Sequence, residues 1–300
     1  MTSEYNKILC LGEVLIDLIA ADDHLLQYYC HFGGSPANVA VHLAKMGHKV
    51  AFAGAVGSDF LGDYIIDFFN YRKVDISLLV QLPRKPTSIV VINEHIDPPI
   101  PIYHKNADFY YHYSSKLQDM IDLVDIIHTT AHSLAFDPLR TTVIKSLKYG
   151  SKKQKIITFD PNFRPMINIE DQNFKQTVFD ALQYVDIIKP SLDDSLKLFD
   201  DSLSPNEIIT RFKRLGVNKS VIVTCGGKGV YYLDEKQKIQ FEPVIPVENI
   251  VGITGAGDAF WSGFLSVLIK QGAIKEGIKS GIRSAAEKIR YKGAIRQNNI

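Results

Sequence analysis

Residues 254–260 read Thr254-Gly-Ala-Gly-Asp-Ala-Phe260 and stand directly before a helical pattern that covers Trp261–Gln271. Small residues at a helix start leave backbone N–H groups bare, and these groups together with the helix dipole favour an anion. Asp258 would repel that anion if binding were the only task of the segment. It fits better as a general base that takes a proton from a hydroxyl while the N–H groups stabilise a phosphoryl group in transfer. The structural alternative is that Asp258 only favours the helix N-terminus and the glycines form a tight turn.

A second segment of small residues lies upstream, at Phe32-Gly-Gly-Ser-Pro-Ala-Asn-Val-Ala-Val41. Its adjacent glycines, Gly33 and Gly34, let the backbone approach a ligand closely. Asn38 offers both a donor and an acceptor, which suits a polyol better than a phosphate. Asp17 follows an apolar strand pattern and could accept two hydrogen bonds from a vicinal diol. The structural alternatives are a turn before an ordinary helix start and, for Asp17, a surface carboxylate.

Short β-branched runs alternate with longer helical patterns along most of the chain. The strand candidates are Ile8–Leu11, Val50–Ala55, Ile89–Asn93, Ile126–Thr129, Ile156–Asp160, Ile187–Lys189 and Val221–Cys225. The helix candidates between them are Ala37–Met46, Asp63–Tyr71, Pro138–Leu147, Asn173–Tyr184, Leu192–Phe199 and Pro205–Leu215. Several strand candidates are almost wholly apolar, as parallel strands covered on both faces are. The alternation predicts an α/β fold with a mainly parallel central sheet, whose ligands lie beyond the carboxyl ends of the strands.

Two stretches, residues 13–32 and roughly 95–113, lack a helical period. In the second stretch, alternate side chains from Ile102 to Tyr113 fall on opposite faces of a predicted strand. One face carries Ile102, His104, Asn106, Asp108 and Tyr110. We interpret the two stretches as a β excursion outside the main sheet that could serve as a lid.

Composition excludes several classes of protein. The chain has 300 residues, of which 46% are hydrophobic, and Lys+Arg total 34 against 33 Asp+Glu, for a formal net charge of +1. Without a basic run or a basic helical face, no nucleic-acid partner is expected. The histidines have separate sequence contexts with no carboxylate pattern joining them, so a transition-metal site is not expected either.

Cysteine usage and the N-terminal residues indicate a cytoplasmic protein. Cys10, Cys30 and Cys225 are scattered, with no CxxC spacing, which favours reduced thiols over a disulfide framework or a zinc site. No pattern of a secretory signal opens the chain. The first apolar run is broken by Glu13 and Asp17 and is too short to span a bilayer.

Taken together, these segments resemble the ribokinase (PfkB) family of carbohydrate kinases, and its fructokinase-like members in particular. The resemblance runs almost from end to end, with the motifs in the order and approximate separations of the family. The matching motifs are Gly12…Asp17, Gly33-Gly34…Asn38, Asp160-Pro-Asn-Phe-Arg164, Thr224-Cys-Gly-Gly-Lys-Gly229, Gly255-Ala-Gly-Asp258 and Gly293-Ala294.

The resemblance implies one ribokinase-like domain over residues 1–300, a three-layer α/β/α sandwich with a mainly parallel sheet and a small β-sheet lid. It implies a sugar site formed by Asp17, Gly33, Gly34, Asn38, Asn106 and Arg164, although Arg164 alone could be a capping or salt-bridged residue. It places ATP along Lys189, Ser191, Thr224, Gly226 and Gly229, the anion hole at Gly255, Ala256 and Gly257, and the base at Asp258. Mg²⁺ is expected with the nucleotide, reached by Asp194 through water. Pairing of exposed lid edges could form a homodimer.

Three departures from the family pattern concern the cations and the nucleotide. Gly252 stands where the family usually has an aspartate that helps to bind a monovalent cation, which puts activation by potassium in doubt. The usual Asn-x-x-Glu reads Ser191-Leu-Asp-Asp194, which we interpret as variation rather than loss. Ile282 falls where many relatives have an asparagine near the adenine, so the contacts of the nucleotide base stay open.

The function that the resemblance implies is transfer of the γ-phosphoryl group of ATP to a sugar hydroxymethyl, with fructose as the first choice of acceptor and fructose 6-phosphate as product. The alternatives are 2-keto-3-deoxygluconate, ribose or a nucleoside as acceptor, and a sensor of sugar or nucleotide that kept the fold without catalysis. A nicotinamide-dependent dehydrogenase is disfavoured because no GxGxxG follows the first strand, which continues as Leu11-Gly-Glu-Val-Leu-Ile.

Overall fold

A mainly parallel sheet forms the centre of the computed structural model, which describes residues 7–21, 27–93, 101–164, 171 and 173–296. Its strand order within these residues is β13-β12-β11-β10-β9-β8-β1-β4-β5. The strands are β1 (Ile8–Leu11), β4 (Val50–Gly57), β5 (Asp75–Leu82), β8 (Ile126–Thr130), β9 (Ile156–Asp160), β10 (Ile187–Ile188), β11 (Ser220–Thr224), β12 (Val230–Leu233) and β13 (Ile239–Glu242). The pairs from β5 to β11 are parallel, and the pairs β11–β12 and β12–β13 are antiparallel.

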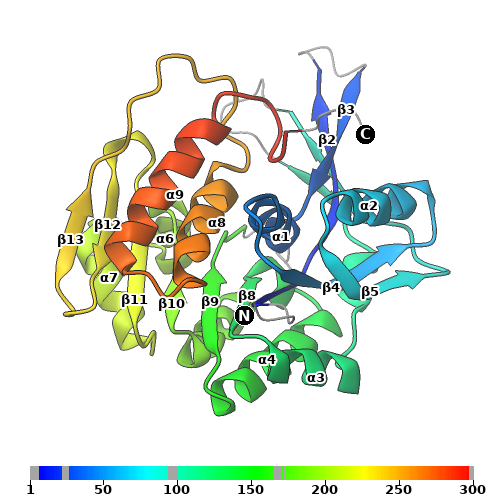
Figure 1. Cartoon of the computed structure of the whole chain (residues 1–300), viewed down its shortest axis with the longest axis horizontal. Coiled ribbons are helices and arrows are strands. Elements are labelled where there is room, and N and C mark those ends of the chain that lie inside the picture. The colour runs from blue at the N-terminus through cyan, green and yellow to red at the C-terminus, as the bar shows by residue number, and fades with distance from the viewer. Residues whose placement is uncertain (1–6, 22–26, 94–100, 165–170, 172, 297–300) are drawn as a thin grey trace.

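Side chains of β1 alternate between two hydrophobic cores, one on each face of the sheet. Leu9 and Leu11 belong to one core, and Ile8 and Cys10 belong to the other. All four are fully buried, because a strand covered on both faces has no solvent-exposed side. The continuous apolar run in the sequence therefore reflects a three-layer arrangement (Figure 1).

Helices cover both faces of the sheet. The core with Ile8 and Cys10 is closed by α1 (Ser35–Lys45), α2 (Phe60–Tyr71), α8 (Ala256–Leu268) and α9 (Ile274–Lys288). The core with Leu9 and Leu11 is closed by α3 (Ser115–Leu123), α4 (Leu139–Lys152), α5 (Phe174–Ala181), α6 (Leu192–Phe199) and α7 (Pro205–Arg214). The predicted sandwich of helices, sheet and helices is confirmed.

A second, smaller sheet has the strand order β3-β2-β6-β7. Its strands are β2 (Leu15–Ala20), β3 (Tyr28–Gly33), β6 (Ile89–Ile92) and β7 (Ile102–His104). In its register, Asp17 lies opposite His31 and Val90, and Val90 lies opposite Tyr103, so these side chains share one face. The chain passes from β1 to β2 through three residues, which joins the two sheets closely (Figure 1).

Two sequence predictions about this region are wrong in detail. Ile89–Asn93 was predicted among the strands of the main sheet, but β6 belongs to the small sheet. The predicted strand through Tyr113 ends at His104, and Ala107–Tyr110 forms a 3₁₀ helix. The chain turns there because the Ser88 hydroxyl accepts the backbone N–H of Asn106 at 2.7 Å, and the Asp108 carboxylate in turn accepts the Ser88 hydroxyl proton. Residues 22–26 and 94–100 of the two lid stretches lie outside the described residues.

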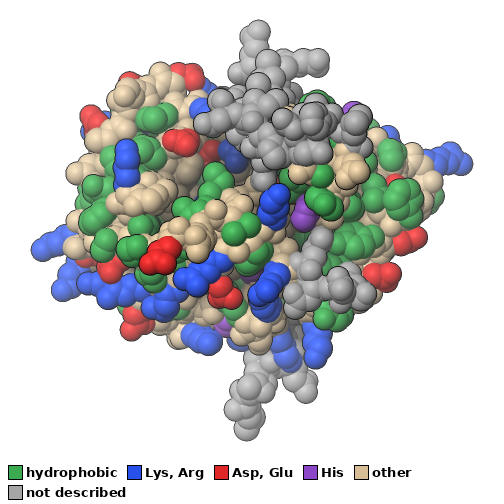
Figure 2. Space-filling view, turned by 90° about the horizontal axis from the view of Figure 1, so that it is seen from above, with side chains coloured by type: hydrophobic (Ala, Val, Ile, Leu, Met, Phe, Trp, Pro, Cys, Tyr) green, Lys and Arg blue, Asp and Glu red, His purple; other side chains and the backbone are tan. Residues whose placement is uncertain are grey.

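The surface of the described residues is mixed in character. On the face shown in Figure 2, Lys and Arg side chains are interspersed with acidic and apolar ones. Tyr29 and Ile102, on the two edge strands of the small sheet, are each more than half exposed. Pairing of two such sheets in a homodimer stays a prediction. None of the helices in the described part of the chain is long and apolar enough to cross a membrane.

Candidate active site

Polar side chains gather where the parallel strands of the main sheet end. Thr130, Asp160 and Thr224 are the last residues of β8, β9 and β11, and Lys189 directly follows β10. Glu13 lies two residues after β1. Because parallel strands point the same way, these residues meet at one edge of the sheet, which is where ligands bind in such folds.

Asp258 lies in the first turn of α8 and is 9% exposed. Its carboxylate accepts two hydrogen bonds from α1, one from the Ser35 hydroxyl at 2.6 Å and one from the Asn38 side-chain amide at 2.8 Å. The N-cap of the helix is Gly255, whose φ of +79° is left-handed, and a Cβ there would lie 2.5 Å from the Cα of Ala294. Only glycine fits this turn, which brings the start of α8 against the C-terminal residues.

Burial raises the pKa of Asp258 to about 6, and the hydrogen bonds from Ser35 and Asn38 oppose this rise. A carboxyl group with this pKa is ionised at neutral pH, yet it is a stronger base than an ordinary exposed aspartate. Burial therefore destabilises the ionised carboxylate and, for the same reason, increases its basicity.

Asn38 uses only part of its hydrogen-bonding capacity within the described residues. Its amide nitrogen donates to Asp258, while its buried oxygen Oδ1 has no partner among the residues that the structure describes. A buried acceptor of this kind is costly unless a donor reaches it. A substrate hydroxyl next to Asp258 would satisfy it, which fits the predicted role of Asn38 at the sugar.

Asp17 and the glycine pair belong to one corner of the small sheet. A Cβ at Gly33 would lie 2.5 Å from the Asp17 carboxylate oxygen Oδ2, so only glycine leaves that carboxylate in its place. Gly34 is the N-cap of α1 and thus precedes Ser35. Asn38 therefore contacts the carboxylate of Asp258 directly, and Gly33 and Gly34 lead from the Asp17 carboxylate to Ser35, the other partner of Asp258.

Lys189 and Asp160 form a buried ion pair beside the start of α8. Their side chains are separated by 2.8 Å and are each 4% exposed. The ammonium of Lys189 lies 3.4 Å from the place where a Cβ of Gly257 would be. A fixed positive charge thus stands directly beside the backbone N–H groups at the start of α8, where the two would act together on an anion.

Arg164, Asp194 and Ser191 form a second polar cluster. The guanidinium of Arg164 lies 2.8 Å from the carboxylate of Asp194, so the salt-bridged alternative for Arg164 is present. The Ser191 hydroxyl caps α6 by accepting the backbone N–H of Asp194 at 3.0 Å. Asp194 also acts on the ionisation of Asp160, so the two carboxylates are neighbours. Each carboxylate is already paired with a cationic side chain, Asp160 with Lys189 and Asp194 with Arg164, so the contact of Asp194 with Mg²⁺ through water stays a prediction.

The remaining predicted nucleotide residues follow β11. Thr224 ends the strand, Gly226 opens a short 3₁₀ helix (Gly226–Lys228), and Gly229 closes it before β12. The space over Gly226 and Gly227 is open, since a Cβ on either would meet nothing within 4 Å. Gly226 lies at an exposed edge, whereas Gly229 is buried. No hydrogen bond joins these residues to Asp258 in the part of the chain that the structure describes, so their role toward the nucleotide stays a prediction.

Asn106 is the predicted sugar residue that the structure separates from the others. It lines a pocket of about 430 Å³ together with Leu18 and Val91. Leu18 and Val91 lie opposite each other in the register and alternate with Asp17 and Val90, so they belong to the other face of the small sheet. The sugar contact of Asn106 stays a prediction.

Sequence reasoning missed Glu13, which fastens the start of the small sheet to the main one. Its buried carboxylate accepts the hydroxyls of Thr130 at 2.9 Å and Ser133 at 2.7 Å, and the backbone N–H of Ser35 at 3.2 Å. In the sequence Glu13 only interrupts an apolar run. The available signal was a carboxylate directly after an apolar strand. A charge that is buried at such a position needs hydrogen-bond partners, so its presence predicts a polar cluster.

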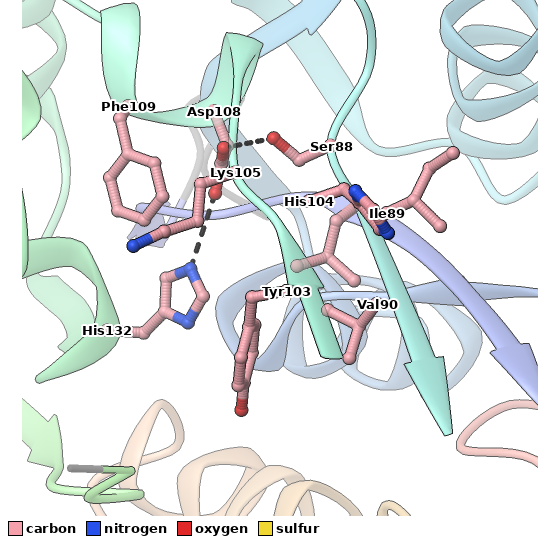
Figure 3. A pocket seen from close by; sticks show the side chains of 10 residues that line it. Ser88, Ile89, Val90, Tyr103, His104, Lys105, Asp108, Phe109 and His132 are labelled. Atoms are coloured by element: carbon pink, nitrogen blue, oxygen red, sulfur yellow. Dashed lines mark hydrogen bonds and ion pairs between the residues drawn. The ribbon is translucent and has the colours of Figure 1, made fainter. Parts of the chain in front are cut away.

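His132 was missed as well, and it belongs to a buried network under the small sheet. Its Nε2 lies 3.3 Å from the carboxylate of Asp108, whose other oxygen accepts from Ser88, and its ring stacks on Phe109 (Figure 3). Burial by itself lowers the pKa of His132, but nearby carboxylates outweigh it, and the pKa lies above its usual value. The network lines a narrow pocket together with Leu15 and Tyr103.

Comparison with known proteins agrees with this arrangement. The pfkB family carbohydrate kinase pattern matches residues 5–300. The chain is 32% identical to the ATP-dependent 6-phosphofructokinase of Thermoanaerobacterium thermosaccharolyticum, over 96% of this chain and 89% of that protein. It is 30% identical to a fructokinase of Vibrio alginolyticus, over 88% of this chain and 84% of that protein.

The solved structures include the Halothermothrix orenii fructokinase, which superposes with a TM-score of 0.82 at 32% identity and covers 92% of this chain and 97% of that one. The family pattern matches nearly the whole length of the chain, and the fold agrees with that of a relative at 32% identity. The chain therefore belongs to the pfkB family of carbohydrate kinases.

Proposed function

We propose that the chain transfers the γ-phosphoryl group of ATP to a hydroxymethyl group of fructose and so forms fructose 6-phosphate and ADP. The observation that carries the proposal is the buried carboxylate of Asp258 in the first turn of α8, held by Ser35 and Asn38. A base and an anion site in contact with each other suit a hydroxyl acceptor and a phosphoryl donor.

The proposed reaction is an in-line displacement. The acceptor oxygen forms a bond to the γ-phosphorus while the bond from that phosphorus to the β,γ-bridging oxygen breaks, and ADP leaves. The proton of the acceptor hydroxyl moves to Asp258. The hydrogen bonds from Ser35 and Asn38 fix the carboxylate in one orientation, so that it need not reorganise during transfer.

The charges around Tyr103, which shares a face of the small sheet with Asp17, support a neutral sugar as acceptor. Burial raises the pKa of Tyr103 to about 12, with Asp17 and Glu13 adding to the rise while Arg164 lowers it. The surroundings of this ring thus include two carboxylates and one guanidinium, and that guanidinium is already paired with Asp194. Carboxylates accept hydrogen bonds from hydroxyl groups and repel phosphate.

ATP and Mg²⁺ would lie on the other side of Asp258. The ammonium of Lys189, 3.4 Å from the Cβ position of Gly257, would meet a phosphate at the proposed anion hole of Gly255, Ala256 and Gly257. Ser191, Thr224, Gly226 and Gly229 are the further candidates for the nucleotide. Asp194 is the candidate that holds Mg²⁺ through water. When bound, Mg²⁺ neutralises the phosphate charge.

Fructose 6-phosphate is the second candidate acceptor, because one relative at 32% identity is a 6-phosphofructokinase. The carboxylates near Tyr103 favour the unphosphorylated sugar. The test is a coupled ADP-release assay with fructose, fructose 6-phosphate, ribose, 2-keto-3-deoxygluconate and a nucleoside, and Asp258→Asn as the blank. The highest kcat/KM with fructose supports the proposal. Preference for another acceptor replaces it, and no release with any acceptor indicates a sensor.

Asp17→Ala is expected to raise the KM for the sugar while the KM for ATP stays within about twofold. The lost hydrogen bonds to a charged group are worth roughly 1.5–3 kcal/mol, which corresponds to a rise of roughly 10- to 150-fold. Ile102→Ala, on the opposite face of the same sheet and 59% exposed, is the control. Steady-state kinetics with each substrate varied in turn measure the effect. An equal rise in both KM values would move Asp17 out of the sugar site.

Ser35→Ala is expected to shift the acid limb of the kcat/KM profile upward. The wild-type limb should lie near pH 6, because Asp258 has a pKa of about 6 and must be ionised to act as a base. The Ser35 hydroxyl donates to the charged form, so its removal raises the pKa further, by roughly 1–2 units for a hydrogen bond of this type. Rate profiles from pH 5 to 9 measure the shift. A limb that does not move would separate Asp258 from the proton transfer.

A further inference from the structure

Lys288 is one of two buried lysines among the described residues, with 1% of its surface exposed. It is the last residue of α9, and its ammonium donates to the backbone carbonyl of Gly252 at 2.9 Å and to that of Tyr291 at 3.2 Å. Burying an ammonium is costly, so a group placed in this way has partners that hold it.

The two carbonyls belong to the two loops that meet at the start of α8. Gly252 lies in the loop that leads to the anion hole, here called the pre-α8 loop (residues 252–255). Tyr291 opens the C-terminal loop (residues 291–296), whose residue Ala294 abuts Gly255, since a Cβ at Gly255 would lie 2.5 Å from its Cα. The ammonium of Lys288 therefore bridges the segments that set the position of Gly255.

Alongside burial, the positive charge of Lys288 contributes to lowering the pKa of a neighbouring histidine, His42. His42, on α1, lies 3.2 Å from the carbonyl of Ala294 through its Nε2. Burial lowers the pKa of His42 to about 4, and the positive charges of Lys45, Lys288 and Arg72 contribute to that lowering. His42 is therefore neutral at physiological pH. The positive charges near the C-terminal loop are carried by Lys45, Lys288 and Arg72 instead.

A monovalent cation, which the family resemblance implies near position 252, does not fit these residues. Gly252 offers no carboxylate, and its carbonyl already accepts from the ammonium of Lys288. A second positive charge within a few ångströms would be repelled strongly in a buried environment. The chain carries its own cation at this place.

We propose that Lys288 is a positioning residue, a built-in cation that ties the pre-α8 loop to the C-terminal loop and so holds the anion hole in place without a monovalent ion. The inference rests on the proposed kinase function for its activity readout only. Its structural part, that the ammonium stabilises the junction of the two loops, is independent of the substrate.

The test compares Lys288→Ala with Lys275→Ala, which changes an exposed lysine on the same helix. We expect Lys288→Ala to lower kcat roughly tenfold or more, as for the loss of a hydrogen bond to a charged group, and Lys275→Ala to change it less than twofold. Wild-type activity should differ by less than about twofold between potassium chloride and tetramethylammonium chloride at equal ionic strength. A saturable several-fold activation of the wild type by potassium would overturn the proposal.

Rescue of the variant separates positioning from bulk stability. Potassium or ammonium chloride should restore part of the kcat of Lys288→Ala and raise its thermal midpoint, whereas tetramethylammonium should do neither, because only the small ions fit between the carbonyls. If the variant is less stable but has wild-type kcat, Lys288 is merely structural and the proposal is wrong. If the variant does not fold, Lys288→Met, which keeps the length of the side chain, takes its place in the same comparison. The thermal midpoint needs no acceptor, so a mistaken sugar assignment leaves this part of the test intact.

Discussion

Asp258→Asn is expected to lower kcat by roughly 10²–10⁴-fold, the usual contribution of a positioned general base. The amide keeps the shape of the carboxylate but cannot accept the proton. Ser35 can reverse its hydroxyl to accept from the new amide, so the contact to α1 is expected to survive. Binding of ATP and sugar, measured by calorimetry, should change little. More than half of wild-type turnover at saturating substrates would show that another group is the base.

The thermal stability of Asp258→Asn shows whether the variant is correctly folded. Burial raises the pKa of Asp258 from 3.8 to about 6, so the folded state binds the proton more tightly than the unfolded state does. The stability from this group is fully present below about pH 4 and is lost as the pH rises through 6. A shift of about 2 units corresponds to roughly 3 kcal/mol. Asp258→Asn should therefore be more stable than the wild type at pH 8 while being nearly inactive, and a lower thermal midpoint would instead mean that the variant is damaged.

Lys189→Met should damage both stability and turnover. It leaves Asp160 buried and without its ammonium partner, and breaking a buried ion pair in this way costs roughly 3–5 kcal/mol. It also removes the ammonium that lies 3.4 Å from the Cβ position of Gly257. The transferring phosphoryl group is proposed to bind beside this glycine. Urea denaturation measures the first effect, and single-turnover kinetics measure the second.

The double variant Lys189→Met/Asp160→Asn distinguishes the two effects. Removing both charges leaves no uncompensated ion, so most of the lost stability should return. Turnover should stay low, because the positive charge at the anion hole is still absent. Recovery of turnover together with stability would mean that Lys189 serves the fold only and has no part in phosphoryl transfer.

Much of the fold could be predicted because its central strands are apolar on both faces. Strand β1 reads as a short apolar run and β8 as a short run rich in β-branched residues, and glycines mark several helix exits. Other elements gave weaker patterns. The edge strand β5 has exposed and buried positions mixed along its length, and no strand was predicted there. Helix α9 contains Gly277 and Gly281, which weaken a helical pattern but allow its close packing on Phe264 and Phe260 of α8.

The site was predictable where its chemistry lies within one segment. Gly255, Gly257 and Asp258 lie within four residues and together predict an anion site with a base. The Gly33-Gly34 pair by itself predicts a close approach of the backbone to a ligand. Contacts between distant segments could not be predicted in the same way. Glu13 depends on Thr130 and Ser133, which are 117 and 120 residues away, and the ammonium of Lys288 reaches back 36 residues to Gly252. Such partners become visible only when the fold brings them together.

The short connection from β1 to β2 couples the position of the small sheet to the orientation of the base. Glu13, between the two sheets, holds the backbone N–H of Ser35, and the Ser35 hydroxyl holds Asp258. A movement of the small sheet would therefore be transmitted to the base through two hydrogen bonds. Because both hydrogen bonds are formed in this structure, the orientation of the Asp258 carboxylate depends on the position of the small sheet. A substitution that displaces the small sheet should therefore also weaken the base, even where it lies far from the anion hole.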